Sequence, residues 1–264
     1  FHYVHHAPGG VAYSDPNAMA EALRQAAADV GIRVTLLDTC YLAGGIDQPL
    51  SPEQRRFSDG SVDAWASRVS ALTSDSTLLA GAAIHSVRAV PRAALGALVS
   101  AWPSGPLHVH LSEQPAENEA CLAAYGLTPT ELLASAGALS PRTTAVHATH
   151  LSTKDISLLG SSGTGACFCP TTEADLADGI GPARELVDAG SLLSLGSDQH
   201  AVIDPLLEAR ALEHGERLRD AAGQQVHHEG EGDERDEERA LRLVGLCHVS
   251  LSALRCGGIG PWPG

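Results

Sequence analysis

His108-Val109-His110-Leu111-Ser112-Glu113 is a strand pattern that ends in groups able to bind a metal and to move a proton. Because side chains alternate along a strand, His108 and His110 share one face. Glu113 follows three residues after His110, just past the expected strand end. An imidazole ligand with a carboxylate close by suits a divalent metal and a proton shuttle. Read alone, the segment also fits structural histidines inside a barrel.

Three further apolar runs end in polar residues of the same kind, namely Ile84-His85-Ser86-Val87-Arg88, Val146-His147-Ala148-Thr149-His150 and Gly196-Ser197-Asp198-Gln199-His200. The carboxyl ends of parallel strands meet at one mouth of a (β/α) barrel, where active sites form. His85, His110, His147 and Asp198 would come in order from four strands. We therefore predict that they meet in a site for metal-assisted hydrolysis, whereas His150 packs or caps.

Taken singly, several of these residues also have structural interpretations. Asp198 could cap a helix, and His147 could be a buried hydrogen-bonding residue. Arg88 could form a surface ion pair, although a guanidinium at a barrel mouth also suits a substrate carboxylate or phosphate. Tyr3 lies on an expected first strand and either contacts substrate or packs in the core.

Apolar runs and helical patterns alternate along the first 220 residues. Strands are predicted at residues 1–6, 33–38, 77–84, 106–111, 143–148, 165–169 and 191–195. A helix is predicted after most of them, the last from Pro205 to Asp220. Such alternation indicates an α/β fold with a parallel sheet. We predict an incomplete TIM-like (β/α) barrel of about seven of the usual eight strands over residues 1–220, without a small β domain.

Composition limits the partners. A formal net charge of −15 argues against nucleic acid and membrane surfaces, which attract basic patches. Much of the acidity lies in residues 229–238, within a segment 221–264 that we predict to be an acidic tail, either disordered or non-native. No apolar run is long enough to span a bilayer. Among six cysteines, Cys167 and Cys169 are expected to be buried free thiols, which favours a reducing cytoplasm.

The ordered set of strand-end residues resembles the amidohydrolase superfamily, whose metal-dependent hydrolases use a distorted (β/α) barrel. The resemblance implies that His110 is a metal ligand and Glu113 a proton shuttle. It also implies that Asp198 binds the metal and accepts a proton from the attacking water, while His147 orients that water. The implied cofactor is one Zn²⁺, and iron or manganese would also suit a His/Asp site.

Other motifs resemble the formimidoylglutamate deiminases of that superfamily, namely residues 1–6, Gln54-Arg55-Arg56-Phe57, residues 85–90 and the run 169–176, Cys-Pro-Thr-Thr-Glu-Ala-Asp-Leu. The resemblance implies hydrolysis of N-formimino-L-glutamate to N-formyl-L-glutamate and ammonia in histidine degradation. Tyr3, His85 and Arg88 would hold this small acidic substrate, with Arg88 on a carboxylate. A homodimer is also implied.

One expected part of the site is missing from the sequence. The superfamily carries an H-x-H pair of metal ligands on its first strand, which would lie before Phe1. His5 and His6 are adjacent and point to opposite faces of a strand, so they cannot replace it. We therefore expect the chain to be truncated at both ends. Two alternatives stay open: a deaminase of an aminated ring, and a catalytically inactive fragment.

Overall fold

The computed structural model describes residues 6–199 and 202–227, which form two compact units. Of the described residues, those up to Val109 and Ala120–Ala138 belong to the first unit. His110–Glu119 and the residues from Leu139 onward belong to the second. Six described strands follow one another in the sheet in the order β1-β2-β3-β4-β5-β6. The predicted α/β class with a parallel sheet is confirmed, and the expected strand at residues 1–6 falls almost wholly outside the described residues.

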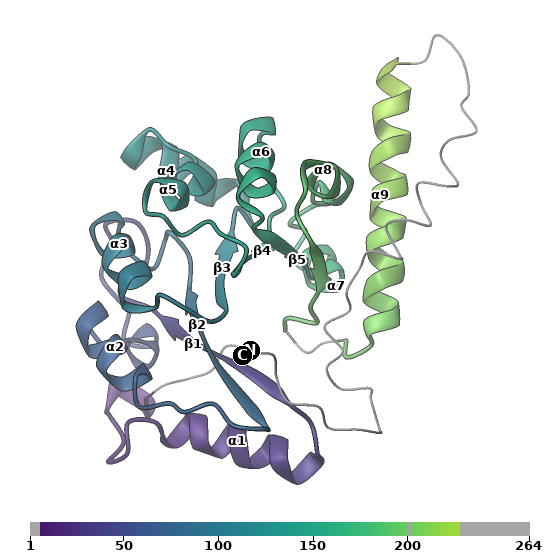
Figure 1. Ribbon diagram of the computed structural model, residues 1–264. Coiled ribbons are helices and arrows are strands. Elements are labelled where there is room, and N and C mark those ends of the chain that lie inside the picture. Colours follow the sequence, from purple (N-terminus) through teal and green to yellow (C-terminus); the bar gives the residue numbers. More distant parts are fainter. Residues whose placement is uncertain (1–5, 200–201, 228–264) are drawn as a thin grey trace. The chain divides into compact units, whose positions relative to one another are not determined.

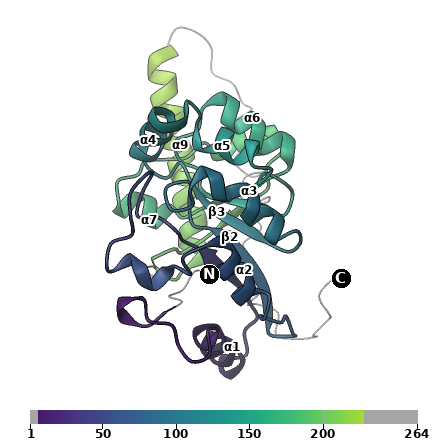
Figure 2. The ribbon, with the colours of Figure 1, turned by 90° about the vertical axis from the view of Figure 1, so that its left-hand side faces the viewer.

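The first unit is built on β1 (Val34–Cys40), β2 (Leu78–Ile84) and the start of β3 (Leu107–Leu111), all parallel. Its helices are α1 (Ala18–Val30), α2 (Val62–Val69), α3 (Arg92–Ala101) and α5 (Pro129–Ser135), with short 3₁₀ turns η1 (Pro8–Gly10) and η2 (Gln54–Phe57). α4 (Pro115–Tyr125) belongs partly to each unit. Figure 2 shows α2 beside α3.

One hydrophobic core cluster of the first unit lies between α1 and the sheet. Ala20 of α1 packs with Leu36 of β1 and Leu78 of β2, all nearly inaccessible to solvent. Beneath α2 the Arg68 guanidinium donates to both oxygens of buried Asp38, at 2.6 and 2.8 Å, and to Asp59. Burial of charge is tolerable here because each charge has an opposite partner.

The second unit contains β4 (Thr143–His147), β5 (Gly165–Phe168) and β6 (Leu193–Leu195), again parallel. Its helices are α6 (Thr153–Ser162), α7 (Pro170–Asp175), α8 (Ala183–Ala189) and α9 (Pro205–His227). The helix expected to end at Asp220 thus continues to His227. It is the yellow-green helix of Figure 1.

Local sequence signals fix where these helices begin and end. Thr128 and Glu131 form a capping box at the start of α5, and Ser152 and Asp155 form another at the start of α6. Each satisfies amide N–H groups that the first helical turn leaves without partners. Gly163 ends α6 with a positive φ of 68°, a conformation that glycine adopts without strain. Short helices ended in this way return the chain to the next strand.

Candidate active site

The ends of three strands carry the candidate chemistry of the second unit. His110 lies near the end of β3, where it alternates with buried Val109 and Leu111 as predicted. His147 is the last residue of β4, and Asp198 follows the end of β6 by three residues. Glu113 lies just beyond β3, in the turn that precedes α4. All four belong to the same unit.

The backbone at these strand ends is strained. Ser112, His147 and Asp198 have φ angles of 48°, 68° and 45°. Non-glycine residues avoid this left-handed region at a cost of roughly 1–2 kcal/mol each. Such outliers cluster at functional sites, where the surrounding structure holds them in place. These φ angles are a backbone observation, separate from the side-chain pattern on which the prediction of the site was based.

His110, His147 and Asp198 form a potential metal site. One donor atom from each of the three side chains lies within 4.8 Å of those of the other two. The imidazole rings of the two histidines stack, with ring centroids 5.7 Å apart and an interplanar angle of 19°. Two imidazoles and a carboxylate are donors that fit zinc and related divalent metals. Asp198 is exposed and His147 is buried, so one side of the group is open to solvent.

Glu113 reaches the same group of residues. Its Oε1 atom lies 3.7 Å from Nε2 of His147, and its side chain is 15% exposed. That distance is too long for a direct hydrogen bond but is within the range of an ion pair. A partly exposed carboxylate beside a buried imidazole can exchange protons with both the site and solvent.

Glu173, on α7, is a residue to which sequence reasoning gave no role. Its Oε1 atom lies 3.3 Å from Nδ1 of His147 and accepts a hydrogen bond from the amide of Cys169 at 2.8 Å. Burial opposes protonation of His147, but Glu173, Glu113 and Asp198 outweigh burial and raise the pKa of His147. The only signal available was the run Cys169-Pro-Thr-Thr-Glu173, quoted above for its resemblance.

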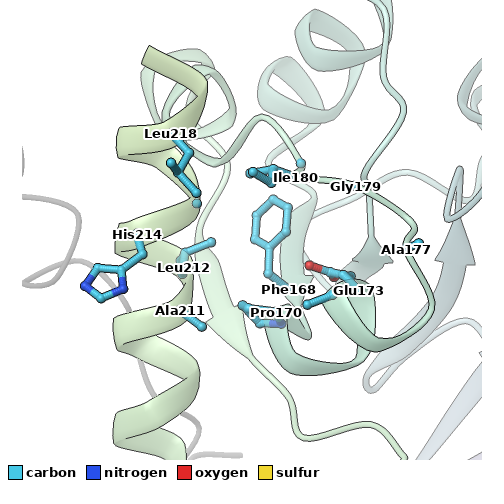
Figure 3. A pocket seen from close by; sticks show the side chains of 13 residues that line it. Phe168, Pro170, Glu173, Ala177, Gly179, Ile180, Ala211, Leu212, His214 and Leu218 are labelled. Atoms are coloured by element: carbon cyan, nitrogen blue, oxygen red, sulfur yellow. The ribbon is translucent and has the colours of Figure 1, made fainter. Parts of the chain in front are cut away.

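Glu173 also borders an apolar cavity of about 430 Å³ in the second unit. Figure 3 shows Phe168 and Ile180 on one side and Leu212 of α9 on the other, with His214 directed away. The cavity is lined mainly by apolar side chains, so it offers few groups for the acidic substrate expected from the sequence. Among its lining residues, Glu173 contacts His147 of the candidate site.

The residues expected to hold substrate belong to the first unit or lie outside the described residues. His85 and Arg88 follow β2 in the first unit, and Tyr3 lies outside the described residues. The ring of Tyr41, which directly follows β1, meets His85 edge-on at 4.5 Å between centroids. Gln54 donates to the Tyr41 hydroxyl at 3.0 Å. Sequence reasoning missed Tyr41, although its place after a strand was a usable signal.

Two further expectations can be compared with the structure. His150 contacts the carbonyl oxygen of Asp178 at 2.6 Å through Nε2, which agrees with a packing role.

Cys167 and Cys169 are free, as expected, but only Cys169 is buried and Cys167 is partly exposed. The two thiols hydrogen-bond to each other, so they lie on one face as expected from the alternation along the strand. Among the residues that the structure describes, no helix combines the length and apolar character needed to cross a membrane.

The parallel sheet and the strand-end histidines and aspartate define an α/β metal-dependent hydrolase type of site. Residues 5–247 match the Amidohydrolase family, and the chain belongs to that family. It is 37% identical over 225 residues to the formimidoylglutamate deiminase of Pseudomonas aeruginosa, a match that covers 83% of this chain and 49% of the relative. An 8-oxoguanine deaminase of the same organism is 42% identical over 116 residues, which are 43% of this chain and 26% of that relative.

Solved structures agree with the fold. A crystal structure of an amidohydrolase from Brucella melitensis matches with a TM-score of 0.79 and 30% identity, covering 93% of this chain and 55% of that one. An adenosine deaminase from Xanthomonas campestris with bound zinc matches with a TM-score of 0.63 and 23% identity, covering 79% and 46%, and supports the fold alone. The chain thus spans about half the length of the relatives that it matches over most of its own length.

Proposed function

We propose that this chain carries enough of the active site of a formimidoylglutamate deiminase to hydrolyse a C–N bond of an acyclic acidic amidine. The observation that carries the proposal is the grouping of His110, His147 and Asp198, with Glu113 at 3.7 Å from His147. The 37% identity to the Pseudomonas aeruginosa deiminase over most of the chain supports the choice of substrate. The reaction would take N-formimino-L-glutamate and water to N-formyl-L-glutamate and ammonia.

His110 and Asp198 would hold the metal, and their donor set fits Zn²⁺. When bound, a divalent ion supplies the positive charge that makes water nucleophilic near neutral pH. Asp198 would take the proton of the attacking water, and His147 would orient its oxygen toward the formimino carbon. Glu113 would deliver protons to the terminal nitrogen. The new C–O bond forms, the bond to that nitrogen breaks, and ammonia leaves.

His85 and Arg88 would recognise the substrate carboxylates in this proposal. A guanidinium presents a planar fork that suits a carboxylate. The Tyr41 hydroxyl, which accepts from Gln54, adds a polar group next to His85. Tyr3 would complete this set, as the resemblance implies. The thiols of Cys40, Cys167 and Cys169 form no disulfide, which supports the proposal of a reducing compartment such as the cytoplasm.

Ammonia release from N-formimino-L-glutamate by the purified chain with added Zn²⁺ tests the proposal. We expect turnover that is abolished in His110→Ala and retained in His214→Ala, which replaces an exposed histidine of α9. A folded chain that binds Zn²⁺ yet releases no ammonia would contradict the proposal that this chain performs the reaction. It would favour the catalytically inactive alternative.

The second candidate function is deamination of an aminated ring. It is favoured by the 42% identity to the 8-oxoguanine deaminase, although that match covers 43% of the chain. A ring substrate would not require Arg88, because it carries no carboxylate. Arg88→Met should abolish hydrolysis of N-formimino-L-glutamate, because that substrate needs Arg88 for its carboxylate. Release of ammonia from 8-oxoguanine that survives in Arg88→Met would instead support the ring deaminase.

A further inference from the structure

We propose that Glu173 is a positioning residue that fixes the tautomer of His147, with the proton on Nδ1 and a lone pair on Nε2. Neutral imidazole carries one proton, which either nitrogen can hold. The nitrogen without the proton is the one that can bind a metal or accept a proton. The choice of tautomer therefore decides whether Nε2, the nitrogen nearer Glu113, presents a lone pair to the candidate site.

The contacts of a single carboxylate oxygen carry the proposal. Oε1 of Glu173 lies 2.8 Å from the amide nitrogen of Cys169 and 3.3 Å from Nδ1 of His147. A backbone amide can only donate, so Oε1 acts as an acceptor there. An acceptor oxygen that faces Nδ1 favours a proton on that nitrogen. Nε2 then faces Oε1 of Glu113 at 3.7 Å.

Two hydrogen bonds with Cys169 hold Glu173 in this position. The amide of Glu173 donates to the carbonyl oxygen of Cys169 at 2.9 Å, while the amide of Cys169 donates to the Glu173 side chain. This reciprocal pair fixes the carboxylate relative to the start of α7. The side chains of Glu173 and His147 are 5% and 1% exposed, so water does not compete strongly for their contact.

This arrangement matches a general feature of histidine sites. A histidine that binds a metal commonly donates its other ring N–H to a carboxylate or a carbonyl, and losing that partner weakens metal affinity or activity by about 10- to 100-fold. For His147, which lies beside the proposed ligands, the same kind of partner would fix the ring that orients the attacking water. The consequence for catalysis rests on the proposed function, but the tautomer itself does not. Failure of the two ideas can therefore be told apart.

A competing interpretation is a second metal site at the same place. His147, Cys169 and Glu173 are all buried, with one donor atom from each within 4.8 Å of the others. We favour the positioning role because Oε1 of Glu173 already contacts Nδ1 and the Cys169 amide. A metal bound to Nδ1 at this place would have to displace the contact between Glu173 and His147.

The primary test is the protonation of His147 in the full chain, measured by nitrogen-15 NMR of labelled histidines at a pH where the ring is neutral. The His147→Gln variant assigns the signal. We expect a protonated Nδ1 and an unprotonated Nε2 in the unaltered chain. A neutral ring that carries its proton on Nε2 in that chain overturns the proposal without any need for a variant.

Substitutions at Glu173 then show what sets the tautomer. In Glu173→Ala the proton should move largely to Nε2, which free imidazole prefers, whereas Glu173→Gln keeps an acceptor oxygen and should retain much of the original tautomer. Glu208→Gln is the matched control, because Glu208 is an equally buried glutamate that binds Thr171 at the other side of α7. An unchanged tautomer in folded Glu173→Ala would contradict the proposal.

Activity tests the consequence, and metal titration tests the competing interpretation. The rate of ammonia release with added Zn²⁺ should fall about 10- to 100-fold in Glu173→Ala. Cadmium gives a distinct ultraviolet absorption when a thiolate binds it. Such absorption in the unaltered chain, lost in both Cys169→Ser and Glu173→Ala, would overturn the positioning role in favour of a second metal site.

Discussion

The imidazole rings of His110 and His147 stack with their centroids 5.7 Å apart, although the two residues come from different strands. One donor atom of each ring lies within 4.8 Å of the other and of an Asp198 carboxylate oxygen. Stacking alone would be an ordinary packing contact between two flat side chains. The nearby carboxylate is what makes the pair a candidate for binding a cation.

Replacing His110 should therefore remove Zn²⁺ binding. We expect His110→Ala to lower Zn²⁺ affinity by more than about 100-fold, because losing a ligand should exceed the usual effect of losing a ligand's partner. Competition with a chelating dye measures the affinity. His214→Ala serves as the control and should leave the affinity unchanged. Equal affinities in the two variants would show that zinc binds at another place.

Arg68 should be a strong determinant of the stability of the first unit. Arg68→Met would leave Asp38 and Asp59 as buried charges without their shared partner, which costs about 3–5 kcal/mol. Urea unfolding measures the change in the free energy of unfolding. Arg217→Ala removes an exposed ion pair on α9 and should cost less than about 1 kcal/mol. Similar costs for the two variants would contradict the assigned role of Arg68.

Ala177 is a site where glycine should stabilise the chain. It follows α7 with a φ of 58°, and the amide of Asp178 bonds back to the carbonyl of Glu173, as in a common glycine-ended helix terminus. Ala177→Gly should raise the free energy of unfolding by about 1 kcal/mol. Ala174→Gly, at an exposed helical position three residues earlier, should lower it by a similar amount. Thermal unfolding of both variants gives the comparison.

The Cys40 thiol should resist alkylation in the folded chain. Burial, aided by Asp59 and Asp38, raises the pKa of Cys40 from 9.0 to about 12, so at pH 8 its thiolate fraction falls about a thousandfold. Mass spectrometry after brief iodoacetamide treatment should find Cys40 unmodified in folded chain and modified in urea. Rapid labelling of folded chain would contradict the prediction.

The same shift has a consequence for stability at alkaline pH. The unfolded chain ionises Cys40 near pH 9, whereas the folded chain keeps the thiol protonated up to about pH 12. The stability linked to this group is therefore complete below pH 9 and decreases as the pH rises from 9 to 12. Cys40→Ala should flatten that decrease in urea unfolding at pH 8 and pH 10.

The sequence allowed much of the fold to be predicted because each described strand is an apolar run with a polar end. The same property located His110, His147 and Asp198, since parallel strands bring their carboxyl ends together. Glu173 could not be located in this way, because its contact with His147 depends on the direction of the first turn of α7. The course of α9 beyond Asp220 was also missed, since its charged sequence resembles a tail as much as a helix. The homodimer, the acidic tail and the exclusion of nucleic acid stay predictions.

The left-handed backbone at Ser112, His147 and Asp198 has a consequence for protein engineering. A procedure that optimised the thermal resistance of this chain would place glycine at all three positions, and at two of them it would erase the candidate chemistry. Conversely, other parallel sheets could be searched for non-glycine residues with a positive φ at successive strand ends. Such a search would find candidate sites even in structures that contain no ligand. The directions of the side chains are set by the peptide backbone before any metal arrives.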